Sequence, residues 1–349
     1  MSKQIMVGNV PVGGGAPIAV QSMCNTNTAD VAATAAQIRA LAAAGCDIVR
    51  VAVPDMEAAR AVRALKARSP VPLVADIHFD WRLALEAVRG GIDKVRINPG
   101  NIGDADRVRA VADACRAAHV PIRVGVNGGS LERGLREKYG VTAEALCESA
   151  LSNIRQLEAC GFYDICVSLK SSDVFTTIRA YRLLHEKCDY PLHLGVTEAG
   201  TPRLGLLKGA AAFGALLCDG IGDTLRVTLT ADPVTEVSAA RDILHALGLN
   251  AGGVTVVACP TCGRTRVDLI PIAEEVERRT AGVRAKLKVA VMGCAVNGPG
   301  EAREADVGIA CGLHEGLLIR KGEIIGKIPE AELVPRLLRE IEELTGEKL

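Results

Sequence analysis

The sequence predicts an α/β protein in which a TIM-type (β/α)8 barrel is followed by a smaller α+β domain. Two observations support this fold class. Over the first two thirds of the 349 residues, eight short β-branched runs alternate with Ala- and Leu-rich stretches of helical period, and this alternation stops near LGLNAGGV. Eight strands that are each followed by a helix match a closed barrel better than an open doubly wound sheet.

The predicted barrel strands are these β-branched runs. They are IAVQSM (18–23), DIVRVAV (47–53), PLVADI (72–77), KVRINP (94–99), PIRVGVN (121–127), DICVSLK (164–170), LHLGVT (192–197) and TLRVTLT (224–230). Thr201-Pro202 and Asp232-Pro233 each place an N-cap residue before a proline at the first position of a predicted helix. Ahead of the strands, IMVGNVPV predicts a hairpin that turns at Gly8-Asn9 and plugs the barrel floor.

The smaller domain is expected after a glycine-rich hinge between Gly248 and Gly253, so that residues 1–250 form the barrel and residues 251–349 the second domain. This length is ordinary for a domain. Its predicted elements are the strands 255–258 and 287–293 with a helix at 267–279 between them, the segment ADVGIACG (305–312), a hairpin at 317–328 that turns at Lys321-Gly322, and a last amphipathic helix from Pro329.

The composition argues against several classes of protein. Lys+Arg and Asp+Glu are both 41, so no net field favours nucleic acid or an acidic membrane surface. We find no signal-like segment and no apolar run long enough to span a membrane, and we expect a cytoplasmic protein. The twelve cysteines do not fit a small secreted disulfide framework. Six of them near helix ends are expected to be small buried hydrophobic residues: Cys46, Cys115, Cys147, Cys160, Cys188 and Cys218.

Five predicted strands carry a cation inside or at the end of an apolar run. These residues are Arg50, Arg96, Arg123, Lys170 and Arg226. A charge in such a place loses water and costs several kcal/mol unless an opposite charge compensates it. The carboxyl ends of barrel strands face one mouth, so these cations predict an anion site there, and a diphosphate is the simplest ligand.

Polar neighbours of these cations support a site at the same mouth. Asn98 and Asn127 follow Arg96 and Arg123, and Asp76-x-His78 ends the third barrel strand. The alternative is that the cations pair internally with Asp76, Glu198 or other carboxylates along the rim, and that His78 is a structural histidine. Glycine-rich stretches such as NPGNIG and NGGS allow a close approach of phosphate oxygens to the backbone.

A possible metal centre lies in the second domain. VACPTCGRT holds Cys259 and Cys262, and MGCAVNGPGE holds Cys294. A tight turn at Gly298-Pro299-Gly300 would bring Glu301 back beside Cys294 as an oxygen ligand. Three thiolates and one oxygen suit an iron–sulfur cluster with one replaceable position. Two alternatives remain open, a zinc site completed by Cys311 or His314 and a redox dithiol at Cys259 and Cys262.

Taken together, the motifs closely resemble the 4-hydroxy-3-methylbut-2-enyl diphosphate synthase family, the reductive enzymes of the methylerythritol phosphate isoprenoid pathway. The resemblance runs nearly end to end through VQSM, VADIHFD, KVRINPGN, RVGVNGGSLE, LHLGVTEAG, GIGDTLRVTLT, CPTCGRT and MGCAVNGPGEA. Two positions differ from the usual pattern: Cys24 stands where the family usually has Thr, and Thr228 stands where Ser is common, which keeps the hydroxyl.

The resemblance implies a barrel that binds 2-C-methyl-D-erythritol 2,4-cyclodiphosphate and a second domain, similar to those of sulfite reductases, that holds a 4Fe–4S cluster. Cys259, Cys262 and Cys294 would ligate three irons and Glu301 the fourth, with Asn297 beside them. The implied substrate residues are Arg50, Arg96, Arg123, Lys170, Arg226 and Thr228, with Asn127 and His78 nearby and Asp76, Asn98 and Glu198 at the reacting end.

The implied reaction is a two-electron reductive dehydroxylation with ring opening, which gives hydroxymethylbutenyl diphosphate and water. Glu198 is our first choice for the acid that protonates the departing oxygen, and His78 the second. Ferredoxin or flavodoxin would supply electrons, and the family implies a homodimer in which one subunit's cluster domain caps the partner's barrel. The rivals are a zinc-stabilised barrel enzyme of the aldolase or pterin-synthase kind and a non-enzymatic electron-transfer or iron-delivery module.

Overall fold

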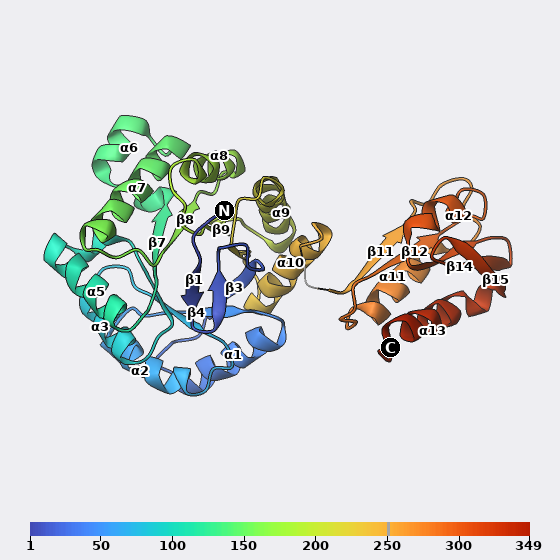
Figure 1. The fold of residues 1–349 in the computed structure, drawn as a ribbon, viewed down its shortest axis with the longest axis horizontal. Helices are drawn as coiled ribbons and strands as arrows, with labels where there is room; N and C mark the ends of the chain where they lie inside the picture. Colours follow the sequence, from blue (N-terminus) through green and yellow to red (C-terminus); the bar gives the residue numbers. More distant parts are fainter. Residues whose placement is uncertain (250–251) are drawn as a thin grey trace. The chain divides into compact units, whose positions relative to one another are not determined.

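A computed structural model describes residues 1–249 and 252–349, without the side chains of Pro99 and Ser130. The chain divides into two compact units, Met1–Leu247 and Gly248–Leu349 (Figure 1). The predicted boundary between residues 250 and 251, and the middle of the predicted hinge, lie outside the described residues. Each unit has its own hydrophobic core, as expected of separate domains.

The first unit is the predicted barrel, built on an eight-stranded sheet of order β8-β7-β6-β5-β4-β3-β10-β9 in which all neighbours are parallel. An isolated bridge between Val167 and Leu192 closes the ring. The strands are β3 (Ala19–Met23), β4 (Ile48–Ala52), β5 (Leu73–Asp76), β6 (Lys94–Ile97), β7 (Ile122–Asn127), β8 (Ile165–Lys170), β9 (His193–Gly195) and β10 (Thr224–Arg226). All eight predicted strands are confirmed.

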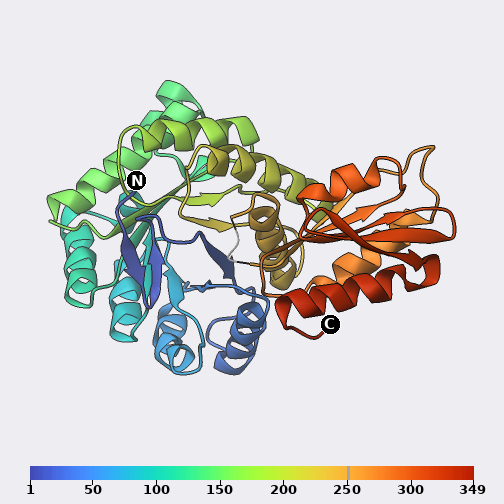
Figure 2. The same cartoon turned by 45° about the vertical axis from the view of Figure 1, so that its right-hand side comes forward.

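A helix follows each barrel strand, and these helices form the outer ring seen in Figures 1 and 2. They are α1 (Val31–Ala43), α2 (Met56–Lys66), α3 (Trp81–Arg89), α5 (Ala105–Ala117), α7 (Ala143–Ala159), α8 (Val174–His185), α9 (Pro202–Cys218) and α10 (Pro233–Ala246). Short helices, α4 (Pro99–Ile102) and α6 (Arg133–Tyr139), lie between strands. Both proline-marked helix starts are confirmed, and the Asp232 side chain accepts a hydrogen bond from the Val234 amide at 2.8 Å.

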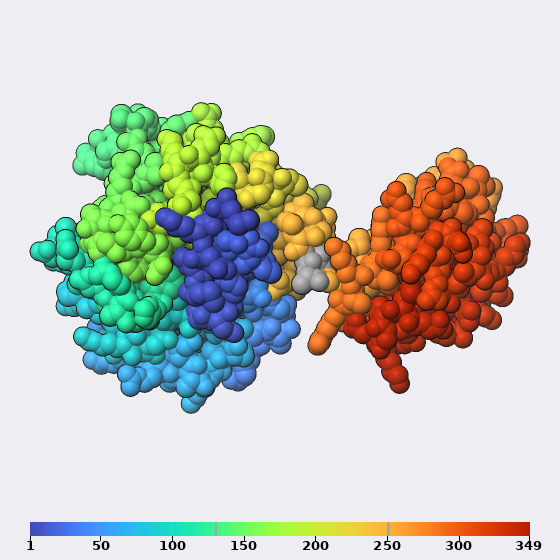
Figure 3. All heavy atoms as spheres, viewed as in Figure 1, coloured from blue at the N-terminus to red at the C-terminus, as the bar shows by residue number. Residues whose placement is uncertain are grey.

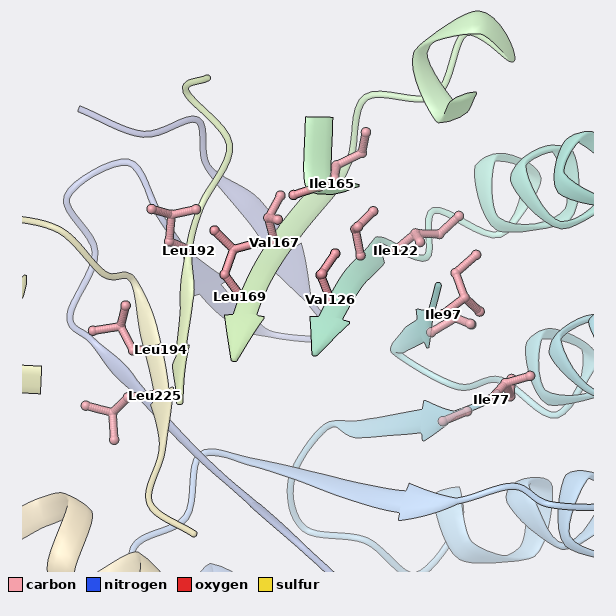
Figure 4. Close-up of a cluster of buried hydrophobic side chains, with 14 of the residues drawn as sticks. Ile77, Ile97, Ile122, Val126, Ile165, Val167, Leu169, Leu192, Leu194 and Leu225 are labelled. Carbon is pink, nitrogen blue, oxygen red and sulfur yellow. The ribbon is translucent and has the colours of Figure 1, made fainter. Parts of the chain in front are cut away.

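Alternation along each strand separates two environments. The outward side chains of β7 and β8, such as Ile122, Val126 and Val167, are fully buried against the helices (Figure 4). Each fully buried aliphatic side chain of this kind contributes about 1.5–3 kcal/mol. The residues between them, including Arg123 and Lys170, point into the barrel, because successive side chains of a strand face opposite sides. The strand pattern therefore directs the cations to the barrel interior.

The predicted N-terminal hairpin is confirmed as β1 (Ile5–Val7) and β2 (Val10–Val12), which pair antiparallel. Gly8 at its turn has φ +57°, a left-handed conformation that favours glycine. Ile5, Val7 and Val12 pack in one buried cluster with residues from the amino-terminal halves of barrel strands. In Figure 3 this dark blue segment covers the centre of the barrel face turned to the viewer. The hairpin seals the barrel floor.

The second unit has a five-stranded sheet of order β11-β12-β13-β14-β15. Its elements are β11 (Val254–Ala258), α11 (Leu269–Thr280), β12 (Leu287–Met292), α12 (Gly298–Glu301), β13 (Val307–Cys311), β14 (Glu315–Arg320), β15 (Glu323–Pro329) and α13 (Leu333–Thr345). The predicted hairpin turns at Lys321 and Gly322, which both have positive φ. The prediction that the last helix begins at Pro329 is wrong: Pro329 ends β15, a 3-10 turn covers Glu330–Glu332, and the helix begins at Leu333.

Half of the six cysteines predicted to be buried hydrophobic residues are buried. Cys46, Cys115 and Cys147 are buried, Cys160 and Cys188 are half-buried, and Cys218, at the last residue of α9, is exposed. Cys24 is buried, and burial followed by the nearby Cys46 raises the pKa of its thiol to about 12. It therefore acts as a small core residue. Among the residues that the structure describes, no helix is both long enough and apolar enough to cross a bilayer.

Candidate active site

A pocket of about 130 Å³ lies among residues from the carboxyl-terminal parts of the barrel strands and the turns that follow them. Its lining is almost entirely polar or charged. The lining residues are Arg50, Asp76, His78, Arg96, Arg123, Asn127, Ser168, Lys170, Thr197, Arg226 and Thr228. All five cations predicted from the strand ends therefore meet in one place.

Two glycines of the barrel wall make room for the cationic side chains. A Cβ atom at Gly195 would lie 2.7 Å from Lys170 Cε, and a Cβ at Gly125 would clash with the Arg96 guanidinium. Alanine at either position would force the cation to move, because real Cβ atoms do not approach other atoms so closely. The small residues of β7 and β9 thus allow Arg96 and Lys170 to lie across the barrel.

Asp76 is the carboxylate at the centre of this group. Its oxygens accept a hydrogen bond from Arg96 Nη1 at 3.2 Å and lie 3.4 Å from His78 Nε2 and 3.8 Å from Arg50 Nε. Burial opposes the negative charge on Asp76. The charge of Arg50, a hydrogen bond from His78 and the charge of Arg96 together outweigh the effect of burial and lower the pKa of Asp76 well below its usual value. Asp76 is therefore an anion that holds Arg50 and Arg96 in place.

A second buried carboxylate, Glu236 of α10, holds Arg226. Arg226 Nη2 and Nε donate to Glu236 Oε2 at 3.1 and 3.3 Å, while the Leu229 amide donates to Oε1 at 2.9 Å. The thioether sulfur of Met23 lies between Arg226 and Arg50, and it accepts a hydrogen bond from Arg50 Nη2 at 2.9 Å. The internal pairing considered for these cations is thus real for Arg50, Arg96 and Arg226.

This pairing does not neutralise the pocket. Arg123 is 1% exposed and Lys170 7% exposed, and neither has an ion pair among the described residues. Burial, followed by the repulsion of neighbouring guanidinium groups, lowers the pKa of Arg123 to about 10 and that of Lys170 well below its usual value. Five cations face two buried carboxylates, so the pocket favours an anion of more than one charge.

Two predicted site residues of the barrel lie apart from the lining. Asn98 is buried and caps α4, where its Oδ1 accepts a hydrogen bond from the Gly100 amide at 3.2 Å. Glu198 follows β9, has φ +52° and is exposed. A non-glycine residue in this left-handed region is uncommon and often marks a functional loop.

Sequence reasoning missed three residues of the site: Ser168, Thr197 and Glu236. The signal for Ser168 was available, because it stands two residues before Lys170 and so faces the same side of β8. Thr197 follows β9 by two residues at the same mouth. Glu236 had no local signal, since it reaches the pocket from a helix that the sequence alone does not orient.

The three cysteines of the predicted metal centre lie at one edge of the second sheet, and we call this group the cysteine edge. β11 and β12 are parallel neighbours, Cys259 directly follows β11, and Cys294 lies two residues beyond the end of β12. The Gly293 amide donates to Cys259 Sγ at 3.1 Å. The loops that carry Cys259 and Cys294 are therefore in contact.

The surroundings of two of these thiols favour thiolates. The backbone amide of Arg264 and the Thr265 hydroxyl help to lower the pKa of Cys262, and the amides of Asn297, Val296 and Gly298 lower that of Cys294. Backbone N–H groups aimed at sulfur stabilise its negative charge. A thiolate is the form in which cysteine binds a metal.

The predicted fourth ligands behave differently. The segment at Gly298 forms one turn of helix, α12, in place of the predicted tight turn, and Glu301 is exposed at its end. Cys311 is fully buried in the core, where burial raises the pKa of its thiol to about 11, and His314 is exposed. Within the described residues, no three Cys, His, Asp or Glu side chains form a metal-binding group. Cys311 is a core residue and a poor zinc ligand.

Comparison with known sequences accounts for both units. A family described as the GcpE TIM-barrel domain matches residues 2–241, and the GcpE protein C-terminal domain matches residues 255–343. The chain belongs to the GcpE family. The resemblance seen in the motifs is thereby confirmed.

Curated members of the GcpE family match this chain over its whole length. A protein of Geobacter sulfurreducens is 60% identical over 99% of each chain, and one of Caldanaerobacter subterraneus subsp. tengcongensis is 54% identical over 100% of this chain and 98% of that protein. A third relative, from Listeria monocytogenes, is 55% identical over 99% of this chain and 94% of its own. All three are named 4-hydroxy-3-methylbut-2-en-1-yl diphosphate synthase (flavodoxin).

Solved structures resemble the GcpE-type barrel at the level of fold. Dihydropteroate synthase from Xanthomonas albilineans has a TM-score of 0.51 and 16% identity, covering 71% of this chain and 98% of its own. N-acetylneuraminic acid synthetase from Leptospira borgpetersenii has a TM-score of 0.51 and 14% identity, covering 81% of this chain and 98% of its own. At such identities the likeness shows only the shared barrel.

The donor chemistry of the cysteine edge fits the iron–sulfur cluster expected of a GcpE-family protein. Cys259, Cys262 and Cys294 supply the thiolate-type ligands that such clusters require, and backbone amides already point at their sulfurs. The three sulfurs are carried by loops, and in the described residues they do not lie close enough together to form one metal-binding group. The fit is therefore one of chemistry and of position at one sheet edge.

Proposed function

We propose that this chain converts 2-C-methyl-D-erythritol 2,4-cyclodiphosphate into 4-hydroxy-3-methylbut-2-enyl diphosphate, an isoprenoid precursor, by two-electron reductive ring opening and loss of water. Membership of the GcpE family, with relatives of 54–60% identity named for this product, makes the chain an oxidoreductase of this pathway. The single observation that supports our assignment of the substrate site is the buried cationic pocket at the barrel mouth.

The pocket would hold the diphosphate end of the substrate. Its volume of about 130 Å³ is below the ~300 Å³ of typical ligand pockets, so it suits the charged end better than the whole molecule. Arg123 and Lys170 lack internal ion pairs and would bind phosphate oxygens directly, while Asp76 and Glu236 keep Arg50 and Arg226 oriented. Thr228 and Asn127 add a hydroxyl and an amide. Cations held in this way stabilise the charge that develops as the ring opens.

The cysteine edge would hold a 4Fe–4S cluster, with Cys259, Cys262 and Cys294 as ligands and Glu301 as the oxygen ligand. When bound, the cluster supplies electrons and Lewis acidity to the substrate. Asn297, the N-cap of α12, lies next to Cys294 through its backbone amide. Because Glu301 is exposed at the end of a short helix, its carboxylate has freedom to bind and to leave.

The proton donor would be His78 or Glu198, and the pocket geometry favours His78. His78 lines the pocket and its Nε2 lies 3.4 Å from Asp76, so the carboxylate orients the ring. Glu198 and Asn98 do not line the pocket and would contribute to the reacting end from its rim. His78→Gln should lower kcat with little change in substrate affinity, and Glu198→Gln should do so if the exposed glutamate is the acid. Single-turnover kinetics on both variants separate the two assignments.

The proposed partners follow from the same reading. The names of the relatives include flavodoxin, and we propose flavodoxin or ferredoxin as the electron donor. We also propose a homodimer and a cytoplasmic location, with no nucleic-acid or membrane partner.

Anaerobic turnover of the cyclodiphosphate with a one-electron reductant is the decisive test of the function. Formation of the linear product would agree with the proposal. Tight binding of the cyclodiphosphate without any product, in protein that contains iron and sulfide, would contradict it. Zinc in place of iron and sulfide would instead favour the rival zinc-stabilised enzyme.

A further inference from the structure

The barrel interior beneath the pocket is polar where barrels of this kind are normally filled with aliphatic side chains. In a (β/α)8 barrel the inward side chains form layers of four contributed by alternate strands, and Val, Ile and Leu dominate them. Here Gln21 of β3 and His193 of β9 are inward residues that do not line the pocket, Arg123 of β7 lies at the pocket floor, and Lys94 of β6 lies at the amino-terminal end of its strand. We call these four residues the inner polar group.

The inner polar group is sealed from solvent. Lys94 and His193 have no exposed surface, and Gln21 and Arg123 are 1% exposed. Below them the hairpin residues Ile5, Val7 and Val12 pack with barrel residues in an apolar cluster. The group is therefore separated from water at the floor.

Several polar atoms of the group have no hydrogen-bond partner among the described residues. These atoms are Gln21 Nε2 and Oε1, Lys94 Nζ, Arg123 Nε and Nη1, and His193 Nε2. The other ring nitrogen of His193 contacts Thr224 Oγ1 at 3.4 Å. Most buried polar atoms in folded proteins are hydrogen-bonded, so a set of unpaired polar atoms that belong to one interior needs an explanation.

The charge of this interior is also uncompensated. The charges that act on Lys94 are those of the Cys166 thiol, Arg123 and Arg50, and no carboxylate is among them. Burial lowers the pKa of Lys94 to about 8. A buried ammonium group without an anion costs several kcal/mol. Beside Lys94 and Arg123 lies a buried thiol, Cys166, whose own pKa is raised by burial, and no carboxylate acts on Lys94 among the described residues.

We infer that the inner polar group is a binding site for a small monovalent anion of the halide class, next to the floor of the diphosphate pocket, with which it shares Arg123. The free atoms include N–H donors from the Lys94 ammonium, the Arg123 guanidinium and the Gln21 amide, which are groups that bind halides. A multiply charged phosphate is more strongly hydrated than a halide, so removing its water in an interior sealed at the floor by the hairpin would cost more. The inference stands on the barrel interior alone and does not depend on the proposed reaction.

Bromide provides the direct test, because its position in a crystal can be identified by anomalous scattering. Crystals of the full-length protein would be grown with bromide and with inorganic pyrophosphate, which should occupy the cationic pocket. We expect an anomalous peak in contact with Lys94 Nζ and Arg123. Water at that position, or bromide confined to the pocket above, would overturn the inference.

Thermal unfolding gives a second, independent readout of the same site. At constant ionic strength and with pyrophosphate present, exchanging gluconate for chloride should raise the Tm of the wild-type protein by a few degrees, because a ligand that binds only the folded state stabilises it. Lys94→Met should lose most of this chloride-specific shift.

Lys138→Met serves as the matched control, since Lys138 is an exposed lysine of the same barrel. It should keep the full shift. An equal shift in Lys94→Met and in the wild type would contradict the inference. If Lys94→Met does not fold, Gln21→Leu, which keeps the charges and removes one donor, should show a smaller shift, and an unchanged one would count against the site.

Discussion

The cationic pocket and the cysteine edge both lie at the carboxyl ends of parallel strands, but they are held in different ways. The cations of the pocket sit on the strands themselves, are largely buried and are oriented by Asp76 and Glu236. The cysteines sit on loops, Cys262 is exposed, and the donors do not yet form a closed set in the described residues. The difference teaches that a site built on strands is assembled by folding, whereas a site built on loops is completed by the group it binds.

The two sites also differ in their electrostatics, because the cations of the pocket are buried and repel one another. Arg50, Arg123 and Lys170 keep their positions although burial and mutual repulsion lower their pKa values. The barrel core supplies the free energy that holds them together. At the cysteine edge the amides of Asn297 and Arg264 already favour thiolates, so binding of the metal needs little further electrostatic help.

The largest effect is expected from the cysteine edge. Cys259→Ser should abolish turnover and lower the iron content, because the cluster would lose a thiolate ligand. Binding of inorganic pyrophosphate by the barrel should stay unchanged. Iron analysis, visible absorbance and calorimetry measure these effects, and Cys218→Ser, a change at an exposed thiol, is the control. Weakened pyrophosphate binding in Cys259→Ser would show that the two sites are not held independently.

Asp76→Asn tests whether the pocket is assembled during folding. Removing this carboxylate leaves Arg50 and Arg96 without their anion and should lower the free energy of unfolding by roughly 3–5 kcal/mol. The pKa of Asp76 is lower in the folded than in the unfolded protein. Its contribution to the free energy of unfolding is therefore present above about pH 4 and is lost as the pH falls toward the folded pKa. Denaturant unfolding at pH 7 and pH 3 should therefore show a difference between wild type and variant that shrinks in acid. A constant difference would contradict the assignment.

Arg123→Met should weaken substrate binding while the cluster stays intact. Arg123 is a buried cation without an internal ion pair, so its loss should raise the Kd for the cyclodiphosphate or pyrophosphate by about 30-fold or more. Calorimetry measures the change, and Arg133→Met, at an exposed arginine of α6, is the control. Unchanged affinity would remove Arg123 from the phosphate site.

Glu301→Ala should separate cluster binding from turnover. If Glu301 is an exchangeable ligand, the variant should retain its iron, since three cysteines remain, and should lose roughly 10–100-fold in turnover. Iron content and anaerobic rate are the two measurements. A wild-type rate would refute the role of Glu301, and complete loss of iron would make it a structural ligand.

The smallest effect is expected at Cys24. The Cys24 thiol is buried, and burial raises its pKa. Cys24→Thr restores the residue usual in the family, so it should leave turnover unchanged and alter the free energy of unfolding by about 1 kcal/mol or less. Thermal unfolding and steady-state kinetics check this. A drop in activity would show that the residue at position 24 influences the reaction.

Local patterns in the sequence were enough for the fold and for most of the pocket. The barrel strands and the cations within them could be predicted because alternation along a strand determines which side chains face inward. The proline-marked helix starts were predictable for the same local reason. Asn98 was placed at the site by its position after Arg96 and by the resemblance, and the reacting role of Glu198 came from the resemblance; the structure shows Asn98 in a helix cap and Glu198 on an exposed turn.

The sequence by itself determined the barrel, the cationic strand ends and the presence of three candidate thiolate ligands, since each depends on neighbours close along the chain. Only the tertiary structure decided that Glu236 from α10 holds Arg226, that Gly125 and Gly195 admit the long cations, and that Cys311 is a core residue. These features join segments far apart along the chain, and the packing that brings them together is set by the whole barrel or sheet.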